Sequence, residues 1–306
     1  MRFRKYHGTG NDFILVTDLD ARMGPPGSLP SDLVVALSDR HTGIGGDGVI
    51  RVIAPSGDPE AAAGGADYRF DLYNSDGSRA EVSGNGLRCL VAAERREGRA
   101  GDGELKILTG ANLVTVRSAD RGRIAVDMGE PKVRRQDVPM AGSGPSLRVD
   151  IDVDGRTIPA SGVSMGNPHV VVFVSDLGAA LDDDLVHGLG PRLEHHPDFP
   201  QRTNVEFVEI VSPTQLRLRT WERGAGETLA CGSGACASAV AAAALERTGP
   251  HVLVDVLGGE LEVEVEPAGH VWLTGGAEEI FAGEVDRDWL EARGLSHHAD
   301  LVAGAP

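Results

Sequence analysis

The sequence predicts an α/β protein of the α+β type, with two pseudo-symmetric domains that each wrap a sheet around one central apolar helix. Two internal echoes lead to this prediction. Residues 83–86 (SGNG) open an apolar segment, and residues 231–234 (CGSG) open another one 148 positions later. Residues 10–13 (GNDF) have a counterpart in residues 166–169 (GNPH), and an apolar run follows each of them. Two echoes in the same order indicate a duplicated unit.

The first half of the chain alternates predicted strands with two helices. Strands are expected over 3–6, 13–16, 49–53 and 68–73, where apolar residues alternate or run together. Ser31 and Asp32 are typical capping residues and open a predicted helix over 31–37, and a second helix is expected over 87–94. Residues 54–66 are rich in Ala, Gly and Pro, which favours a loose surface excursion.

The second half repeats this pattern more weakly. An alanine-rich helix is expected over 235–243, and its small side chains suit burial on all sides. Short strands are expected over 124–128, 205–208 and 216–219, and residues 182–184 (DDD) favour an exposed helix start. The chain changes domain near residues 129–131. We therefore expect one domain over 1–130 and another over 131–276, with residues 277–306 returning to the first.

Composition excludes several classes of protein. Of 306 residues, 41% are apolar and 25% charged, and no apolar run approaches the roughly 20 residues of a membrane span. A net charge of −17 disfavours nucleic acid as a partner. The N-terminus lacks the apolar stretch of a signal peptide, and three cysteines are an odd set for disulfides, so we expect a cytoplasmic protein.

Cys231 is the strongest single candidate for chemistry. A residue before a glycine-rich helix start lies among unpaired N–H groups at the positive end of the helix dipole. We expect these groups to lower the pKa of the Cys231 thiol and to bind a substrate carboxylate. The structural alternative is a buried packing cysteine, which we expect instead for Cys89 and Cys236, because both lie inside their helices.

Other signals carry little weight. Residues 43–48 match G-x-G-x-x-G, but this loop follows a predicted helix and precedes a strand, the reverse of a dinucleotide-binding fold. His195-His196 and His297-His298 have no ligand spacing to a cysteine or third histidine, so they are expected on the solvated surface, and no metal site is predicted.

Five motifs between Lys5 and about Gly283 resemble, in order, those of the diaminopimelate epimerase family. They are HGTGNDF at 7–13, DRHTGIGGDG at 39–48, NSDGS at 74–78, SMGNPH at 164–169 and ERGAGETLACGSG at 222–234. The resemblance implies a cofactor-independent amino-acid epimerase with two similar domains. In that family two cysteines, one from each domain, remove and return the α-proton on opposite faces of the substrate.

The resemblance also implies site residues, carried over position by position. Cys231 becomes one of the two acid/base residues. Substrate-binding roles fall on Asn11, Asn74, Asn167, Asn204, Glu222 and Arg223, and donors at the helix starts on Gly84, Asn85, Gly232 and Ser233. Glu222 and Arg223 would grip either the distal or the reacting end of the substrate. His169 and Glu222 are implied as residues that tune the cysteine pKa values.

One departure from the family pattern is serious, because the first catalytic cysteine falls on Ser83. A hydroxyl is much less acidic than a thiol, so a serine base is harder to form at neutral pH. Cys89 is six residues further along the helix, about 9 Å deeper, and cannot easily replace it. An engineered trap, a natural branch in which serine works, and a relative with altered chemistry all remain open.

The leading functional hypothesis is a pyridoxal-independent isomerase that interconverts LL-2,6-diaminopimelate and its meso form, in lysine and cell-wall precursor biosynthesis. Only Lys5, Lys106 and Lys132 could hold pyridoxal phosphate, and none lies in a candidate catalytic position, so no cofactor is expected. The resemblance implies a homodimer with a small amino-acid substrate. The alternatives are a related one-base racemase or eliminating enzyme, a catalytically impaired variant, and an amino-acid-binding module without activity.

Overall fold

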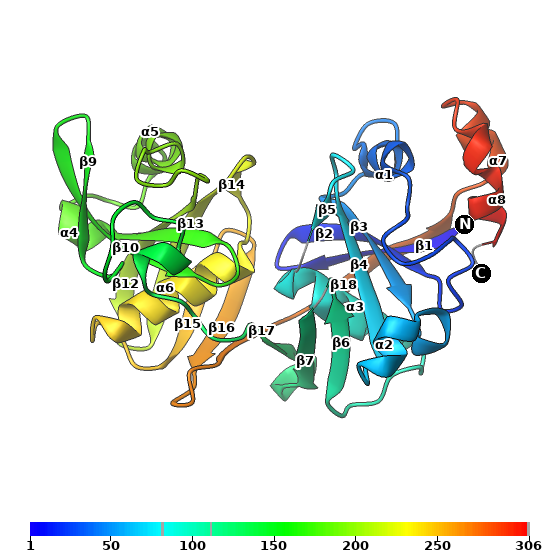
Figure 1. The fold of residues 1–306 in the computed structure, drawn as a ribbon, viewed down its shortest axis with the longest axis horizontal. Helices are drawn as coiled ribbons and strands as arrows, with labels where there is room; N and C mark the ends of the chain where they lie inside the picture. Colours follow the sequence, from blue (N-terminus) through cyan, green and yellow to red (C-terminus); the bar gives the residue numbers. More distant parts are fainter. Residues whose placement is uncertain (81–82, 111, 305–306) are drawn as a thin grey trace. The chain divides into compact units, whose positions relative to one another are not determined.

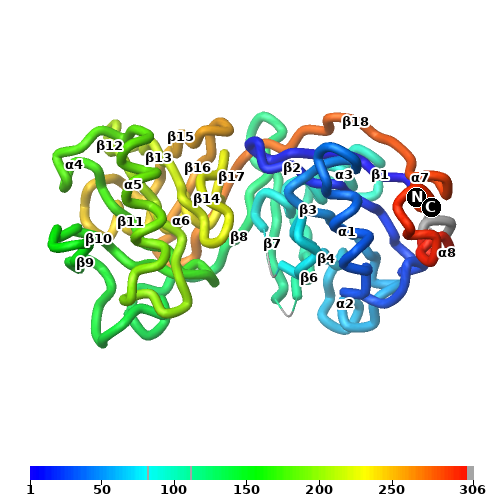
Figure 2. The backbone as a smooth tube through the Cα atoms, turned by 90° about the horizontal axis from the view of Figure 1, so that it is seen from above, coloured from blue at the N-terminus to red at the C-terminus, as the bar shows by residue number. Residues whose placement is uncertain are grey.

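The computed structural model describes residues 1–80, 83–110 and 112–304. Contacts within the chain divide it into two compact units, which we call unit 1 (Met1–Val126 with Gly275–Pro306) and unit 2 (Asp127–Thr274). The sequence had placed these boundaries at residues 130 and 276. Figure 2 shows how the C-terminal segment comes back to unit 1, where β18 (Glu278–Glu284) pairs antiparallel with β1 (Arg2–Gly8).

Unit 1 is built on a mixed sheet. β1 and β2 (Asn11–Thr17) form an antiparallel hairpin, β2 runs parallel to β3 (Gly48–Ile53), and β3 is antiparallel to β4 (Tyr68–Asn74). β4 is parallel to β6 (Leu105–Thr109), which is reached through helix α3 (Gly84–Arg96). The remaining elements are α1 (Ser31–Ser38), β5 (Arg79–Ala80), β7 (Asn112–Ser118), β8 (Ile124–Asp127), α7 (Arg287–Glu291) and α8 (Ala299–Gly304).

Unit 2 repeats the same series of pairings. β10 (Arg156–Ser164) and β11 (Pro168–Phe173) are antiparallel, β11 is parallel to β12 (Asn204–Ser212), and β12 is antiparallel to β13 (Gln215–Glu222). β13 is parallel to β15 (His251–Val256), reached through α6 (Gly232–Ala244). The other elements are β9 (Val149–Val153), α4 (Val174–Leu177), α5 (Asp183–Glu194), β14 (Gly226–Thr228), β16 (Gly259–Val265) and β17 (Val271–Gly275). The predicted α+β fold with two similar units is confirmed.

Each unit has helices on both faces of its strands (Figure 1). In unit 1, α1 packs with Val49, whereas Gly86 of α3 lies against the next strand residue, Ile50. Successive strand residues point to opposite faces, so the two helices cover opposite sides. In unit 2, α5 packs with Val172 and Phe207, and α6 packs with Val171 and Val208. The central helices of the prediction are α3 and α6.

Both central helices begin three residues earlier than expected. The predicted starts were 87 and 235, and the observed starts are Gly84 and Gly232. The glycine-rich stretches that precede the two predicted helices form the first turns of the observed helices. The helix predicted over 31–37 is present, but its N-cap is Pro30, without a side-chain cap bond, rather than Ser31 or Asp32. At the other predicted start, Asp182 caps α5 by accepting the Leu185 N–H.

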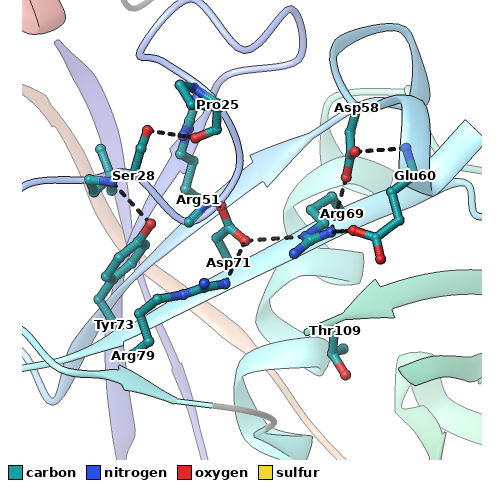
Figure 3. A network of polar contacts seen from close by, with 12 residues as sticks. Pro25, Ser28, Arg51, Asp58, Glu60, Arg69, Asp71, Tyr73, Arg79 and Thr109 are labelled. Atoms are coloured by element: carbon teal, nitrogen blue, oxygen red, sulfur yellow. Dashed lines mark hydrogen bonds and ion pairs between the residues drawn. The ribbon is translucent and has the colours of Figure 1, made fainter. Parts of the chain in front are cut away.

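The expectation of a loose excursion over residues 54–66 was wrong. This segment contains a 3-10 turn (Pro55–Gly57) and a short helix, α2 (Pro59–Ala63), and Ala61 is fully buried. Figure 3 shows what holds it, because Arg69 of β4 pairs with Asp58 and Glu60 at 3.2 and 2.8 Å. Arg69 also contacts Asp71 on its own strand. The composition of 54–66 gave no sign of a partner that lies outside the segment.

None of the helices in the described part of the chain is long and apolar enough to cross a membrane.

Candidate functional site

The two echoing motifs fold into the same local structure, one in each unit. Ser83 is the N-cap of α3 and its Oγ accepts a hydrogen bond from the Gly86 N–H at 3.1 Å. Cys231 is the N-cap of α6 and its Sγ accepts from the Gly234 N–H at 3.4 Å. Side chains in this position are fixed at the positive end of the helix dipole, where a developing negative charge is stabilised.

Two α3 side chains that follow Ser83 belong to a connected set of four polar groups, Asn85, Arg88, Asn11 and Asp47. We call these four residues together with the cap Ser83 the α3 cluster. Asn85 is buried, donates to Asn11 Oδ1 at 3.2 Å and accepts from Arg88 at 2.8 Å. Asn11 donates in turn to Asp47 at 2.6 Å. The structure therefore brings together Asn11 and Asn85, which the sequence singled out 74 residues apart.

Arg88 is a functional candidate that the sequence analysis missed. It is fully buried, and its guanidinium donates to the Thr9 hydroxyl and the Gly276 carbonyl, both at 3.1 Å, as well as to Asn85. It thus fastens the tight turn before Asn11, in which Thr9 and Gly10 have positive φ values of 55° and 84°. A charged residue on the buried face of an apolar helix was the available signal.

Asn74 has a more exposed position in unit 1. It ends β4, and its side chain donates to the Ser78 hydroxyl at 3.0 Å. The Ser75 N–H donates to the Asp47 carbonyl at 3.1 Å, which holds this turn beside the partner of Asn11.

In unit 2 the corresponding set, the α6 cluster, consists of Cys231, Ser233, His169, Asn167 and Glu206. His169 is fully buried and lies between two partners, Glu206 Oε1 on Nδ1 and Asn167 Oδ1 on Nε2, each at 2.8 Å. The Cys231 sulfur, one ring nitrogen of His169 and one carboxylate oxygen of Glu206 all lie within 4.8 Å of one another. Ser233 Oγ is 3.6 Å from the Cys231 sulfur.

Glu206 was absent from every sequence motif, yet it lies at the centre of the α6 cluster. A Cβ on Gly234 would stand 2.7 Å from Glu206 Oε1 and 3.2 Å from Cys231 Sγ. Only glycine at 234 lets the helix start approach the carboxylate and the thiol so closely. An acid among the apolar residues of the buried strand 205–208 was the signal that could have revealed it.

Asn204, Glu222 and Arg223 lie beside the α6 cluster. Asn204 is buried, donates to the Pro168 carbonyl at 3.0 Å and accepts from the Arg223 backbone N–H at 2.9 Å. Asn204 therefore connects β12 to the turn that follows β13. The Glu222 carboxylate accepts from the Thr228 hydroxyl, while the Arg223 side chain is exposed.

The charge environment of Cys231 differs from the sequence expectation. Burial raises the pKa of the Cys231 thiol well above its usual value, and the nearby charges of Glu222 and Glu206 raise it further. The hydrogen bonds from Ser233 and the Gly234 N–H lower it, but they are the smaller causes. The predicted lowering of the pKa was wrong for the free protein because desolvation outweighs the helix start.

The other two cysteines occupy core positions. Cys89 and Cys236 are both fully buried, and burial raises the pKa of Cys89 to about 12. Of the three lysines, Lys5 is buried in an ion pair with Asp12 at 2.7 Å.

The surface assignment of the paired histidines was wrong for His298. It is buried, and its Nε2 lies 2.9 Å from Asp32 Oδ1 of α1, whereas His297 is exposed. His196 is also largely covered and contacts the Asp152 carbonyl at 2.9 Å.

In the described residues, Asp32, His297 and His298 form a second group whose possible metal-ligand atoms lie within 4.8 Å of one another. Sequence spacing did not reveal this group, since its members are separated by most of the chain.

Comparison with known proteins agrees with this architecture. The chain is 42% identical over 289 residues to diaminopimelate epimerase of Synechococcus elongatus, covering 94% of this chain and 98% of the relative. It is 44% identical over 294 residues to diaminopimelate epimerase of Moorella thermoacetica, covering 94% and 100%. Among solved structures, a probable proline racemase from Agrobacterium radiobacter K84 has the same fold, with a TM-score of 0.67 at 18% identity over 98% of this chain and 95% of that one. Residues 3–134 and 162–280 match the family described as diaminopimelate epimerase, and the chain belongs to that family.

Proposed function

We propose that this protein is an isomerase that interconverts LL-2,6-diaminopimelate and meso-2,6-diaminopimelate by removing and returning the proton on the α-carbon. The observation that carries the proposal is the capping geometry at Cys231, a thiol held against the Gly234 N–H within the complete family motif. The diaminopimelate epimerase relatives at 42% and 44% identity support the same substrate.

Cys231 is proposed as the base on one face of the α-carbon. A thiolate there accepts hydrogen bonds from the Gly234 N–H and the Ser233 hydroxyl, which stabilise the anion. Its resting pKa is raised partly by Glu222. A substrate ammonium near Glu222 would offset that negative charge, so substrate binding itself would make the thiolate easier to form.

Ser83 is proposed as the acid on the other face. Its Oγ already accepts the Gly86 N–H, so the hydroxyl proton is free to point toward a substrate carbanion. Returning a proton from Ser83 leaves an alkoxide, which one helix start stabilises less well than a thiolate. We therefore expect slow proton removal from the Ser83 side and fast removal from the Cys231 side.

Substrate binding is assigned to the polar side chains around the two caps. The assigned groups are Asn11, Asn74, Gly84 and Asn85 in unit 1 and Asn167, Asn204, Glu222, Arg223, Gly232 and Ser233 in unit 2. Many polar groups beyond the acid/base pair suit a substrate with a second, unreacting amino-acid end, because binding that end contributes to the transition state. His169 and Glu222 are proposed to tune the Cys231 pKa.

A one-base racemase or eliminating enzyme is less well supported, since the relatives named above are diaminopimelate epimerases. The deciding experiment is proton NMR in deuterium oxide with the LL and meso isomers supplied separately. Loss of the α-proton signal together with formation of the other isomer supports the proposal. Binding without exchange, or release of a β-substituent from another amino acid, would contradict it.

The reaction is proposed to need neither pyridoxal phosphate nor a metal. Lys5 is engaged by Asp12, and Lys132 is paired with Glu130 at 3.2 Å on the surface. Dialysis against EDTA and hydroxylamine is expected to leave turnover unchanged. Activity that is lost and then restored by pyridoxal phosphate or a metal would overturn the assignment.

The cellular setting is also a proposal. The substrate places the enzyme in lysine and peptidoglycan precursor biosynthesis in the cytoplasm, and the family resemblance favours a homodimer. Sedimentation equilibrium of the purified chain tests the dimer, for which a monomer mass near 32.1 kDa would be the contrary result.

A further inference from the structure

Glu206 is the one member of the α6 cluster to which the proposed reaction gives no step. It is fully buried on β12, its Oε1 contacts His169, and its Oε2 has no hydrogen-bond partner among the described residues. Burying a carboxylate with one oxygen unpaired costs stability, so such a residue calls for a functional explanation.

The fold itself does not require an acid at this position. In unit 2, His169 pairs in register with Asn204, and in unit 1 the matching pair is Phe13 with Gly48. Two residues further along each second strand, Glu206 therefore corresponds to Ile50. Both contact the equivalent glycine of the central helix, since a Cβ on Gly86 would stand 3.2 Å from the Ile50 side chain. Where unit 1 has the apolar Phe13 and Ile50, unit 2 has His169 and Glu206.

The hydrogen bonds fix how protons are shared along this pair. Asn167 Oδ1 can only accept, so the Nε2 atom of His169, 2.8 Å away, carries a hydrogen. A 2.8 Å contact between His169 Nδ1 and Glu206 Oε1 requires another proton between those two atoms. Whichever of the two holds that proton, the His169–Glu206 pair is neutral overall.

This arrangement also orients Asn167. With its Oδ1 occupied by His169, the Asn167 carboxamide has only its NH₂ group left to offer a ligand. Rotating the His169 ring or changing its tautomer would remove the donor on Nε2 and free the carboxamide to flip. Glu206 is the only described side-chain partner on the opposite ring nitrogen.

We propose that Glu206 is a positioning residue that, through His169, locks the Asn167 carboxamide with its NH₂ group toward the substrate and keeps the pair near Cys231 neutral. This inference rests on the proposed function, in which Asn167 binds substrate. Glu206 itself neither touches substrate nor transfers a proton.

Two substitutions of Glu206 test the proposal. Glu206→Ile copies the residue of unit 1 and removes the partner of His169 Nδ1, so we expect KM to rise by about 10-fold, the scale of one lost bond to a buried group, with a smaller change in kcat. Glu206→Gln can donate to Nδ1 and so preserve the hydrogen on Nε2, and it should recover most of the loss. The pH profile of kcat/KM should keep its shape in Glu206→Gln.

Glu94→Gln is the matched control, because Glu94 is an equally buried acid on α3, paired with Arg99 at 2.7 Å and outside both clusters. It should lower thermal stability and leave KM unchanged. An unchanged KM in folded Glu206→Ile would overturn the proposal. A Glu206→Gln variant as defective as Glu206→Ile, or one with a displaced pH profile, would show that the carboxylate transfers protons instead.

A second readout is independent of turnover. Proton–nitrogen NMR of the histidine rings should show His169 with a hydrogen on Nε2 in the wild type and in Glu206→Gln, and a mixture of tautomers in Glu206→Ile. An unchanged His169 spectrum in Glu206→Ile contradicts the positioning role. If the wild type fails to exchange α-protons, the proposed function is wrong, and this spectrum still tests the Glu206–His169–Asn167 connection separately.

Discussion

Replacing Ser83 with cysteine is the sharpest test of the two-sided acid/base mechanism. The site is already shaped for a thiol, because the Oγ–N distance to Gly86 is 3.1 Å and the equivalent Sγ–N distance at Cys231 is 3.4 Å. Ser83 is only half-buried whereas Cys231 is 6% exposed, so a thiol at 83 would suffer less desolvation. We therefore expect a thiolate to form more readily at 83 than at 231.

The expected gain follows from the scale of general acid–base catalysis. One well-placed group contributes 10²–10⁴-fold, so Ser83→Cys should raise turnover by on the order of 10²-fold or more, about 2.7 kcal/mol of barrier. The loss of a serine cap should cost about 1 kcal/mol of stability. Exchange of α-protons from the two isomers, fast for one and slow for the other in the wild type, should become more nearly equal.

The assay is deuterium incorporation at the α-carbon, followed by proton NMR with each isomer separately. Ser31→Cys, on the exposed first residue of α1, controls for the mere addition of a thiol. The reasoning is refuted if Ser83→Cys and Ser83→Ala both leave exchange unchanged. Another group or water would then serve that face of the substrate.

Three further outcomes are expected. Glu222→Gln removes a negative charge that raises the Cys231 pKa, so the acidic limb of the kcat/KM profile should move to lower pH; a shift to higher pH would contradict this assignment. Gly234→Ala places a Cβ 2.7 Å from Glu206 Oε1, which should displace the Cys231 cap. The rate of α-proton exchange measured by NMR should fall at least 10-fold, the scale expected when catalytic groups are misplaced. A wild-type rate would show that the helix start can shift to accommodate the methyl group. Arg69→Met leaves Asp58 buried without its cation and Asp71 with only the longer contact to Arg79 at 3.7 Å, and it should cost about 3 kcal/mol in urea unfolding. The exposed Arg22→Met should cost roughly 0.5 kcal/mol or less, and equal effects would refute the importance of the network in Figure 3.

The fold and the two cap positions could be predicted because their signals are local. Alternating apolar residues mark strands, and the glycine-rich motifs before Leu87 and Ala235 mark the central helices. The repeat between these motifs indicated the duplication that the matching strand pairings display. Local signals were weaker for α2, whose Asp58 and Glu60 are held by Arg69 on a strand that follows the segment.

The residues that were missed are those whose role depends on contacts across the sheet. Glu206 meets His169 only because β11 and β12 are adjacent and parallel, and nothing in residues 205–208 indicates that pairing. The prediction that the pKa of Cys231 is lowered was wrong for the same reason. The helix start is visible in the sequence, whereas full burial and two carboxylates from other strands are properties of the packed unit.

The duplication explains why the functional differences between the two units were hard to predict from the sequence. The two units are alike at the caps of their central helices, but they differ further along those helices and on the strands beneath them. Counting from each cap, Arg88 of α3 corresponds to Cys236 of α6, and the first is a buried cation bound to Thr9 and Asn85 while the second packs in an apolar core. On the strands beneath, Ile50 corresponds to Glu206. Unit 1 therefore has a buried cation on its central helix, whereas the matching position in unit 2 is uncharged and the His169–Glu206 pair on the strands beneath it is neutral overall. The buried cation of Arg88, which has no counterpart at Cys236, is a further reason to expect that cysteine at position 83 titrates lower than Cys231.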